Sequence, residues 1–320
     1  MGEQNSPDGP SGIYVLPKAD TSFVARKFLD IPYTVAGDSA SGLSMAGRPN
    51  DSWSPVSSAF QKLDIYLPEE ELKPYPVIVA IHGGAWMMCD KNDLQVLPML
   101  EGLKRGYAVV AVNYRLSQEA LFPAQLQDVK AAIRWVRANA AQYGFDVDRI
   151  AAWGGSAGAH LASLVGLTAG VAMLEDQRLG NPAYRSDVSA VVAWYGPTDF
   201  LMMDTYLAQS GLVPRDHGKP DSPESRLLGA TIADVPDRVR FANPETYAHA
   251  GAPPFFLQHG DIDSTVPMQH SVSLAERLAL ANGADKVFLE ILKGAEHADQ
   301  AFETKANVAK VLDFLDEALG

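Results

Sequence analysis

Short runs of apolar residues recur along the chain from residue 61 onward. Apolar and polar residues alternate over 61–67, which predicts a half-buried strand that stops at Pro68. Later runs are almost continuously β-branched or apolar, as expected for strands buried on both faces of a sheet. These runs cover 77–81, 107–112, 149–153, 190–195 and 254–258, and a last strand is expected over 286–292.

Between these runs, apolar residues recur every three or four positions, which is the spacing of one helix face. Over 123–143, the apolar residues from Leu126 to Val136 follow this spacing. Further helices are expected over 157–167, 269–281 and 300–319. Strands that alternate with helices predict an α/β fold, in which a mostly parallel central sheet is covered by helices on both faces.

Two internal segments depart from this alternation. Residues 39–58 are rich in Gly, Ser and Pro and predict a long surface loop. Residues 200–243 hold short helical patterns and several prolines, and predict a cap-like insertion across one end of the sheet. We therefore expect a single α/β domain over 21–320 that carries this insertion, rather than two domains.

The composition excludes several classes of function. The chain has 320 residues with 26 Lys and Arg against 39 Asp and Glu, so its formal net charge is −13. This balance argues against nucleic acid as a partner, because such binding needs a basic surface. Cys89 is the only cysteine, which rules out an internal disulfide and a cysteine metal cluster. No run reaches the roughly 18 apolar residues of a membrane span.

The N-terminal segment bears on localisation. Residues 1–20 begin with Gly, Pro, Ser and charged residues and lack the apolar run of a signal peptide, so we expect a flexible tail. Together with the composition, this favours a soluble, cytoplasmic protein with a small-molecule partner. A secreted mature form that has lost its signal peptide would look the same and stays open, as does assembly into a homo-oligomer.

The most informative motif is G-x-S-x-G, which reads GGSAG at 154–158. It lies directly between an expected buried strand and an expected helix, which is the context of a nucleophile elbow. Such a turn raises the Ser156 hydroxyl above the sheet, and the helix N-terminus directs N–H groups toward a developing anion. A glycine-rich turn with a capping serine is the alternative. The context favours Ser156 as a nucleophile.

A second motif, HGGAW at 82–86, follows an expected buried strand and is typical of a loop that builds an oxyanion hole. The backbone N–H groups of Gly84 and Ala85 are expected to join that of Ala157 in holding the anion. Each donor of this kind is typically worth about 10²–10³ in rate. We expect His82 to hold the loop by hydrogen bonds rather than to act as the base.

A serine hydroxyl becomes a good nucleophile only when an oriented base accepts its proton. In this architecture the chain order is serine, then acid, then histidine. Polar segments follow two late strands, at the sheet edge where ligands bind. We assign Asp263 as the acid and His297 as the base, with Asp261 as the competing acid and Asp199 as a third choice. The other histidines are expected at the surface or in supporting positions: His160, His217, His249, His259 and His270.

Several motifs taken together resemble α/β-hydrolase esterases. They are QKLDIYLP, HGGAW, NYRL, FPAQ, GGSAG, HGDxDxxVP and GxxH, in the order expected, and ESRLLG and NP in the insertion also fit. The resemblance is to the bacterial branch grouped with feruloyl and acetylxylan esterases, which borders the hormone-sensitive-lipase group. It implies a triad of Ser156, Asp263 and His297, and neither a metal nor a cofactor.

Gly155 departs from this pattern, because the elbow of these esterases more often reads GDSAG. The missing side chain removes a hydrogen-bonding group beside the nucleophile and is expected to free space there. The residues predicted to line the substrate pocket follow the oxyanion loop or begin the insertion: Trp86, Met87, Met202, Met203 and Tyr206. Flexible and flat side chains suit an apolar pocket, and core packing is the alternative.

The expected activity is hydrolysis of a carboxylic ester through an acyl-enzyme on Ser156. Small acyl or aromatic esters are favoured as substrates over long-chain lipids, because no large exposed apolar lid is evident in the sequence. Two alternatives stay open. One is an amidase or peptidase that uses the same triad, with an activity like that of kynurenine formamidases. The other is a non-catalytic binding protein built on a hydrolase fold.

Overall fold

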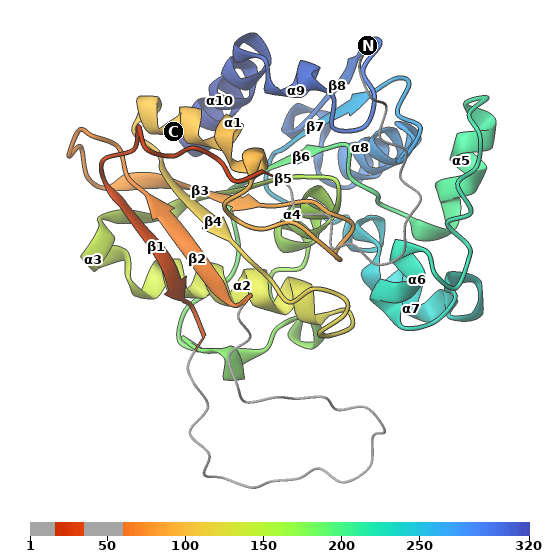
Figure 1. Cartoon of the computed structure of the whole chain (residues 1–320), viewed down its shortest axis with the longest axis horizontal. Helices are drawn as coiled ribbons and strands as arrows, with labels where there is room; N and C mark the ends of the chain where they lie inside the picture. The colour runs from red at the N-terminus through yellow and green to blue at the C-terminus, as the bar shows by residue number, and fades with distance from the viewer. Residues whose placement is uncertain (1–16, 35–59) are drawn as a thin grey trace, which may run out of the picture.

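An eight-stranded sheet runs through the centre of the molecule (Figure 1). The computed structural model describes residues 17–34 and 60–320, so the expected loop over 39–58 and most of the expected tail lie outside the described residues. Across the sheet the strand order is β1-β2-β4-β3-β5-β6-β7-β8. The strands are β1 (Lys27–Pro32), β2 (Lys62–Tyr66), β3 (Tyr75–Ile81), β4 (Ala108–Val112), β5 (Phe145–Gly155), β6 (Ala190–Trp194), β7 (Phe255–Gly260) and β8 (Val287–Leu292).

The sheet is parallel from β4 to its β8 edge, whereas β1 and β2 pair antiparallel at the other edge. In the centre, Ile78 of β3 pairs with Val109 of β4 on one side and with Ala151 of β5 on the other. Each strand expected from the sequence is present, and the α/β fold is confirmed. Because β5, β7 and β8 run parallel, their carboxyl ends point the same way, and the residues that follow these three strands lie close together.

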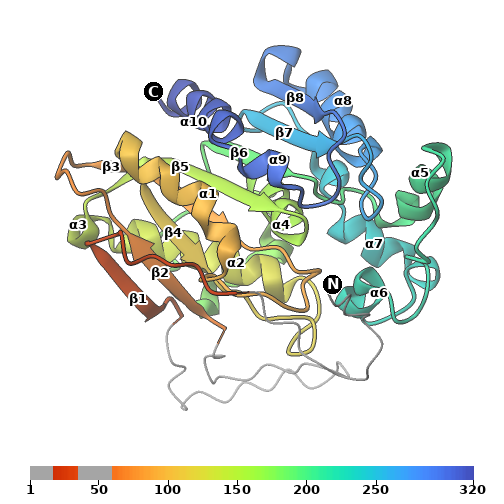
Figure 2. The same cartoon turned by 45° about the horizontal axis from the view of Figure 1, so that its top comes forward.

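Helices cover both faces of the sheet, and each face has its own apolar core. Val77 and Val79 of β3 face the core that contains residues of α2, α4 and α8. Ile78 and Ala80 face the opposite core with α1 and α10, and α1 crosses in front of the sheet in Figure 2. The helices are α1 (Leu97–Leu100), α2 (Ala124–Ala138), α3 (Ala140–Tyr143), α4 (Ala157–Leu167), α5 (Met203–Gln209), α6 (Pro223–Leu228), α7 (Pro236–Ala242), α8 (Gln269–Asn282), α9 (Gln300–Glu303) and α10 (Lys305–Leu319).

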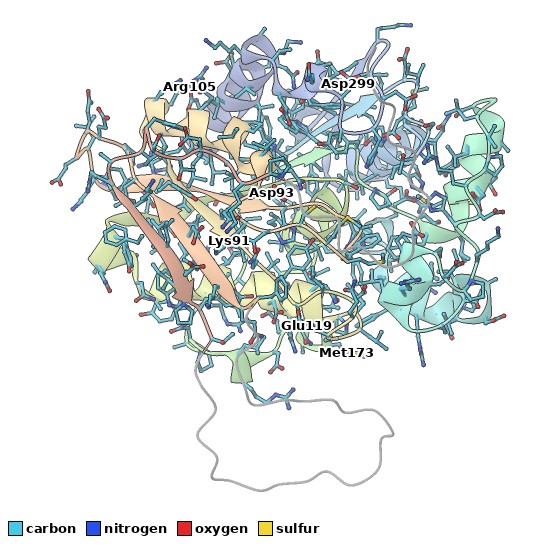
Figure 3. All side chains as sticks on the ribbon, viewed as in Figure 1. Lys91, Asp93, Arg105, Glu119, Met173 and Asp299 are labelled. Carbon is cyan, nitrogen blue, oxygen red and sulfur yellow. The ribbon has the colours of Figure 1, made fainter. Side chains whose placement is uncertain are left out.

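The edge strand β1 is held by charged side chains that are distant in sequence. The Nζ atom of Lys91 lies 2.9 Å from Oδ1 of Asp30 in β1 and 3.1 Å from Oδ1 of Asp64 in β2. The side chains of Lys91 and Asp64 are only 3% and 2% exposed, whereas that of Asp30 is 66% exposed, so the cluster reaches from the interior to the surface. Figure 3 labels Lys91. Lys91 follows the HGGAW loop closely, and the same cluster therefore ties β1 to that loop.

Residues 200–243 form α5, α6 and α7, joined by short turns. In both views these helices lie on the opposite side of the molecule from β1 (Figures 1 and 2). Ser222 begins α6 by accepting the N–H of Ser225, and Gly229 ends it with a left-handed backbone. The role of this segment as a cap stays a prediction. The division of the chain into a tail and one domain also stays a prediction.

Candidate active site

The GGSAG motif forms the sharp turn between β5 and α4. Ser156 has φ 55° and ψ −122°, a strained backbone conformation for a residue with a side chain. The turn packs closely, because a Cβ atom added at Gly158 would lie 2.1 Å from the carbonyl oxygen of Ile81. Ser156 donates its N–H to the carbonyl oxygen of Trp194 at 2.9 Å, which fixes the elbow against β6.

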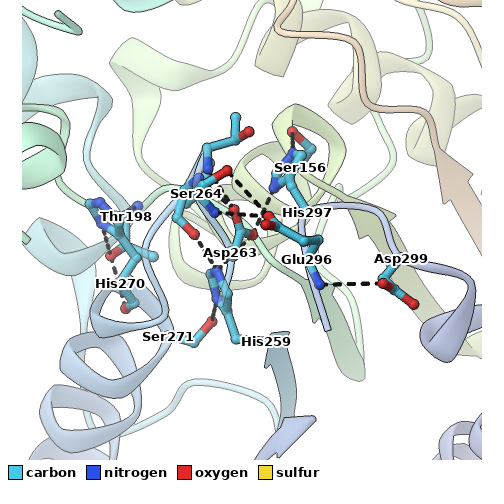
Figure 4. Close-up of polar contacts among 12 residues, drawn as sticks. Ser156, Thr198, His259, Asp263, Ser264, His270, Ser271, Glu296, His297 and Asp299 are labelled. Carbon is cyan, nitrogen blue, oxygen red and sulfur yellow. Dashed lines mark hydrogen bonds and ion pairs between the residues drawn. The ribbon is translucent and has the colours of Figure 1, made fainter. Parts of the chain in front are cut away.

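The structure brings Ser156, His297 and Asp263 into one hydrogen-bonded series (Figure 4). The Oγ atom of Ser156 lies 3.0 Å from Nε2 of His297, and Nδ1 of His297 lies 2.8 Å from Oδ2 of Asp263. Asp263 is 1% exposed, whereas 18% of the His297 side chain faces solvent. The Asp263 carboxylate is therefore shielded from water, whereas the His297 ring is accessible from solvent.

Asp263 is held by donors on both carboxylate oxygens. Oδ1 accepts the N–H groups of Thr265 and Val266 at 2.9 and 2.8 Å, and Oδ2 lies between His297 and His259. Burial alone would raise the pKa of Asp263, but the hydrogen bonds from His259 and His297 hold it well below its usual value. The carboxylate is therefore ionised at neutral pH.

The competing acids have other partners. Asp261 accepts the N–H of Gly294 at 2.6 Å, so it supports the turn after β8, as expected for the first residue out of the strand. Asp199 accepts the N–H of Leu201 and the side-chain amide of Asn243. Neither carboxylate is hydrogen-bonded to His297 in the described part of the chain.

The HGGAW loop lies directly against the elbow. A Cβ atom added at Gly83 would be 3.3 Å from Cβ of Ser156, and the Gly83 N–H donates to Oε1 of Gln95 at 2.8 Å. Gly84 and Ala85 both have positive φ, 96° and 53°. In residues 17–34 and 60–320, neither of them donates its N–H to another residue. Their donors are therefore free for a ligand, although their role as an oxyanion hole stays a prediction.

The position of His82 has a structural explanation. His82 is buried and stacked on Tyr114 with ring centroids 4.4 Å apart, and Nδ1 of its ring lies 2.9 Å from the carbonyl oxygen of Gly83. Burial lowers the pKa of His82, which fits a neutral ring that supports the loop. In the described residues, no group of three or more His, Cys, Asp or Glu side chains is arranged to hold a metal ion.

Comparison with known proteins identifies the family. The profile of the BD-FAE family matches residues 63–278, from β2 to α8. The chain belongs to the BD-FAE family. The matched region contains the elbow and Asp263 and ends before His297. Within the described residues, no helix is long and apolar enough to cross a membrane.

Relatives of this BD-FAE chain are named as esterases. Esterase LipQ of Mycobacterium tuberculosis is 34% identical over 256 residues, which cover 77% of this chain and 56% of LipQ. The probable carboxylic ester hydrolase LipM of the same organism is 35% identical over 219 residues, or 68% of this chain and 48% of LipM. The chain thus spans about half the length of these curated relatives.

Solved structures agree with this placement. A truncated form of a carbohydrate esterase from gut microbiota superposes with a TM-score of 0.78 at 30% identity, covering 94% of this chain and 99% of that one. Thermogutta terrifontis esterase 2, phosphonylated by sarin, superposes with a TM-score of 0.61 at 30% identity, covering 80% of this chain and 88% of that one. Both are similar to this chain across most of its length.

The predicted pocket residues of this BD-FAE chain divide into two groups. Trp86 and Met203 are only 2% and 1% exposed, and the Trp86 ring packs edge-on against Phe200 with centroids 5.4 Å apart. Packing accounts for these two side chains, which corrects their assignment to the pocket. Residues Met87, Met202 and Tyr206 are partly exposed and stay predicted pocket residues.

The expectation of free space beside Gly155 is wrong. A Cβ atom added at Gly155 would lie 2.7 Å from the hydroxyl oxygen of Tyr195, which fills that space from the end of β6. The Tyr195 ring also packs edge-on against His297, with centroids 4.9 Å apart. Burial raises the pKa of Tyr195 well above its usual value, so the hydroxyl stays neutral.

Restoring the acidic residue at this position is expected to destabilise the protein. Gly155→Asp forces a Cβ atom against the Tyr195 ring, and overpacking of this kind costs about 1–3 kcal/mol. Thermal unfolding of Gly155→Asp against wild type measures the effect. In a Tyr195→Ala background the same substitution is expected to cost less, because the clash is gone. Equal stability of Gly155→Asp and wild type would contradict this account.

The sequence does not predict Gln95 as a supporting residue, and for His259 it predicts a surface or supporting position without naming its partner. Gln95 accepts the Gly83 N–H, and His259 contacts Asp263 from inside the sheet. The only sequence signal for His259 was its place in the HGDxD segment, four residues before the acid. The signal for Gln95 is weaker still, since it depends on the path of a loop that returns to the elbow.

Proposed function

We propose that this chain is a serine esterase that hydrolyses carboxylic esters through an acyl-enzyme on Ser156. The hydrogen-bonded series from Ser156 through His297 to the buried Asp263 carries the proposal. A hydroxyl beside an imidazole that is itself oriented by a carboxylate is the arrangement that activates a serine nucleophile. The relatives named as esterases support the same activity.

In the first half of the proposed reaction, Oγ of Ser156 attacks the ester carbonyl carbon while Nε2 of His297 accepts its proton. The carbonyl oxygen becomes an anion and receives hydrogen bonds from the N–H groups of Gly84, Ala85 and Ala157. When this intermediate collapses, His297 returns the proton to the departing alcohol. The product of this half-reaction is an acyl ester on Ser156.

In the second half, a water molecule takes the place of the alcohol. His297 accepts a proton from this water as it attacks the acyl carbon, and the same N–H groups hold the second anion. Collapse returns the proton to Ser156 and releases the carboxylic acid. Throughout, Asp263 keeps the imidazole in one orientation and stabilises the positive charge that forms on it.

We further propose small acyl or aromatic esters as the substrates. The partly exposed side chains of Met87, Met202 and Tyr206 offer adaptable apolar surface. The similarity to a carbohydrate esterase supports adding an acetylated sugar to the substrates tested. The acidic net charge favours a small molecule over nucleic acid as the partner, and a cytoplasmic location and the oligomeric state stay predictions.

A panel of p-nitrophenyl esters from acetate to palmitate, with a feruloyl ester and an acetylated sugar, tests this proposal. We expect kcat/KM to be highest for an acyl chain of a few carbons or for the aromatic ester. Highest activity on palmitate would contradict the substrate class. A matched pair of an aryl ester and an N-formyl amide distinguishes an esterase from an amidase, and faster amide cleavage would favour the amidase.

A further inference from the structure

His259 is a buried histidine that the proposed reaction does not use. It lies near the end of β7, is 0% exposed, and is drawn beside Asp263 in Figure 4. Burying a polar ring in the interior costs free energy unless both of its nitrogen atoms have hydrogen-bond partners. The partners of His259 are therefore informative about its role.

Both ring nitrogens of His259 are engaged. Nε2 lies 2.7 Å from the carbonyl oxygen of Val266 and 3.3 Å from Oδ2 of Asp263, which are both acceptors, so this nitrogen carries a proton. Nδ1 lies 2.7 Å from Oγ of Ser271, a hydroxyl that is able to donate to it. These contacts fix one tautomer, in which Nε2–H binds the carbonyl oxygen of Val266 and lies within 3.3 Å of Oδ2 of Asp263.

This single side chain connects three elements around the acid. It begins in β7, it binds the turn that contains Asp263 and Val266, and it reaches Ser271 in α8. Val266 donates its own N–H to Oδ1 of Asp263 at 2.8 Å, so the turn and the ring enclose the carboxylate. Oδ2 is thereby shared between His259 and His297.

We propose that His259 is a positioning residue, whose Nε2–H sets the orientation and the charge that Asp263 presents to His297. The inference rests on the proposed function, because it assigns His259 a part in activating the same serine. A donor on Oδ2 competes with His297 for the negative charge of that oxygen. Removing the donor leaves more charge for His297 and favours its protonated form.

Other titratable side chains surround this pair from every neighbouring segment. Burial lowers the pKa of His270 in α8 to about 3, so the His270 ring stays neutral near neutral pH. Burial would lower the pKa of His217 in the insertion, but its hydrogen bond with Glu224 raises it. Tyr195 packs on His297 and stays neutral, and the Glu296 carboxylate binds Ser264 beside Asp263. Of these groups, His217 requires a control.

The test compares the pH dependence of kcat/KM for p-nitrophenyl acetate in His259→Leu, His259→Gln and wild type. We expect His259→Leu to lower kcat/KM about 10-fold to 100-fold, since a small misplacement of a catalytic group has effects of this size. The acid limb of the pH profile of kcat/KM for His259→Leu is expected to move to higher pH by about half a pH unit. His259→Gln keeps an N–H donor near the same place and is expected to stay within about threefold of wild type.

Two further variants keep the test decisive. Ser271→Ala frees the ring without removing it and is expected to move the acid limb in the same direction by a smaller amount. If His259→Leu does not fold, an unmoved limb in Ser271→Ala overturns the inference. His217→Gln removes the neighbouring titratable histidine and is expected to leave the limb in place. An equal shift in His217→Gln would mean that the limb reports the neighbouring charge, and would also overturn it.

The outcomes separate this inference from the proposed function. An inactive wild-type chain contradicts the proposed function and the inference with it. An active wild type, together with a folded His259→Leu that has the same pH profile and the same kcat/KM, overturns the inference alone. Loss of activity in His259→Gln as large as in His259→Leu would also overturn it, because the donated N–H would then not be the relevant feature.

Discussion

Replacing Ser156 with alanine is expected to lower kcat on a p-nitrophenyl ester by about 10⁶, as deletion of a triad serine does. The variant loses the atom that forms the acyl-enzyme, whereas the oxyanion donors and the fold stay in place. A residual rate of about 10³–10⁴ over the uncatalysed reaction is expected from those donors and from substrate binding. Initial-rate measurements across substrate concentration give kcat and KM separately.

His297→Ala is expected to lower kcat by a similar factor, because Ser156 without a base is a weak nucleophile. The double variant should be little worse than either single one, since the two residues act as a unit. A fluorophosphonate probe should label wild type and fail to label Ser156→Ala. His249→Ala is the matched control, because this histidine is exposed and lies outside the motifs. Near wild-type activity in either triad variant would disprove the assignment.

The central sheet could be predicted from the sequence because burial on both faces leaves a local pattern. In β3 and β4 nearly every side chain is buried, so continuous apolar runs mark both strands. Helix α4 begins and ends where expected, since the elbow fixes its first residue. The helix expected over 300–319 is instead two helices, because the side chain of Thr304 accepts the N–H of Asn307 and begins α10 there.

Strand β1 could not be predicted, because its position depends on contacts that are remote in sequence. Its Phe28 and Leu29 side chains are 45% and 49% exposed, so they show no buried pattern. The strand is held by pairing with β2 and by the ion pair between Asp30 and Lys91. The local pattern of apolar residues does not predict either interaction.

The same distinction applies to the site. Chain order and strand direction predict that Ser156, Asp263 and His297 meet, because parallel strands bring their carboxyl ends to one edge. Which side chains fill the spaces around these three depends on neighbouring strands. Tyr195 fills the space beside Gly155 from β6, and His259 reaches Asp263 from within β7. These contacts need the three-dimensional arrangement, and they correct the expectation of free space beside the nucleophile.

Asp263→Asn is expected to lower kcat by about 10⁴ while the fold and KM change little. The carboxylate accepts Nδ1–H of His297, which leaves Nε2 without a proton and able to accept the one on Ser156. An asparagine amide is able to donate to Nδ1 instead, and this would place the proton on Nε2. The base would then present a donor to the serine, in the wrong tautomer for proton abstraction.

Asp261→Asn is the matched control for this prediction, because the two carboxylates are two residues apart in one turn. Asp261 accepts the Gly294 N–H rather than a histidine proton, and the oxygen of an asparagine is able to accept the same hydrogen bond. Its kcat is therefore expected to stay within a few-fold of wild type. Initial rates and thermal unfolding of both variants decide the outcome. A loss in Asp261→Asn as large as in Asp263→Asn would mean that the turn, and not the tautomer of His297, controls the rate.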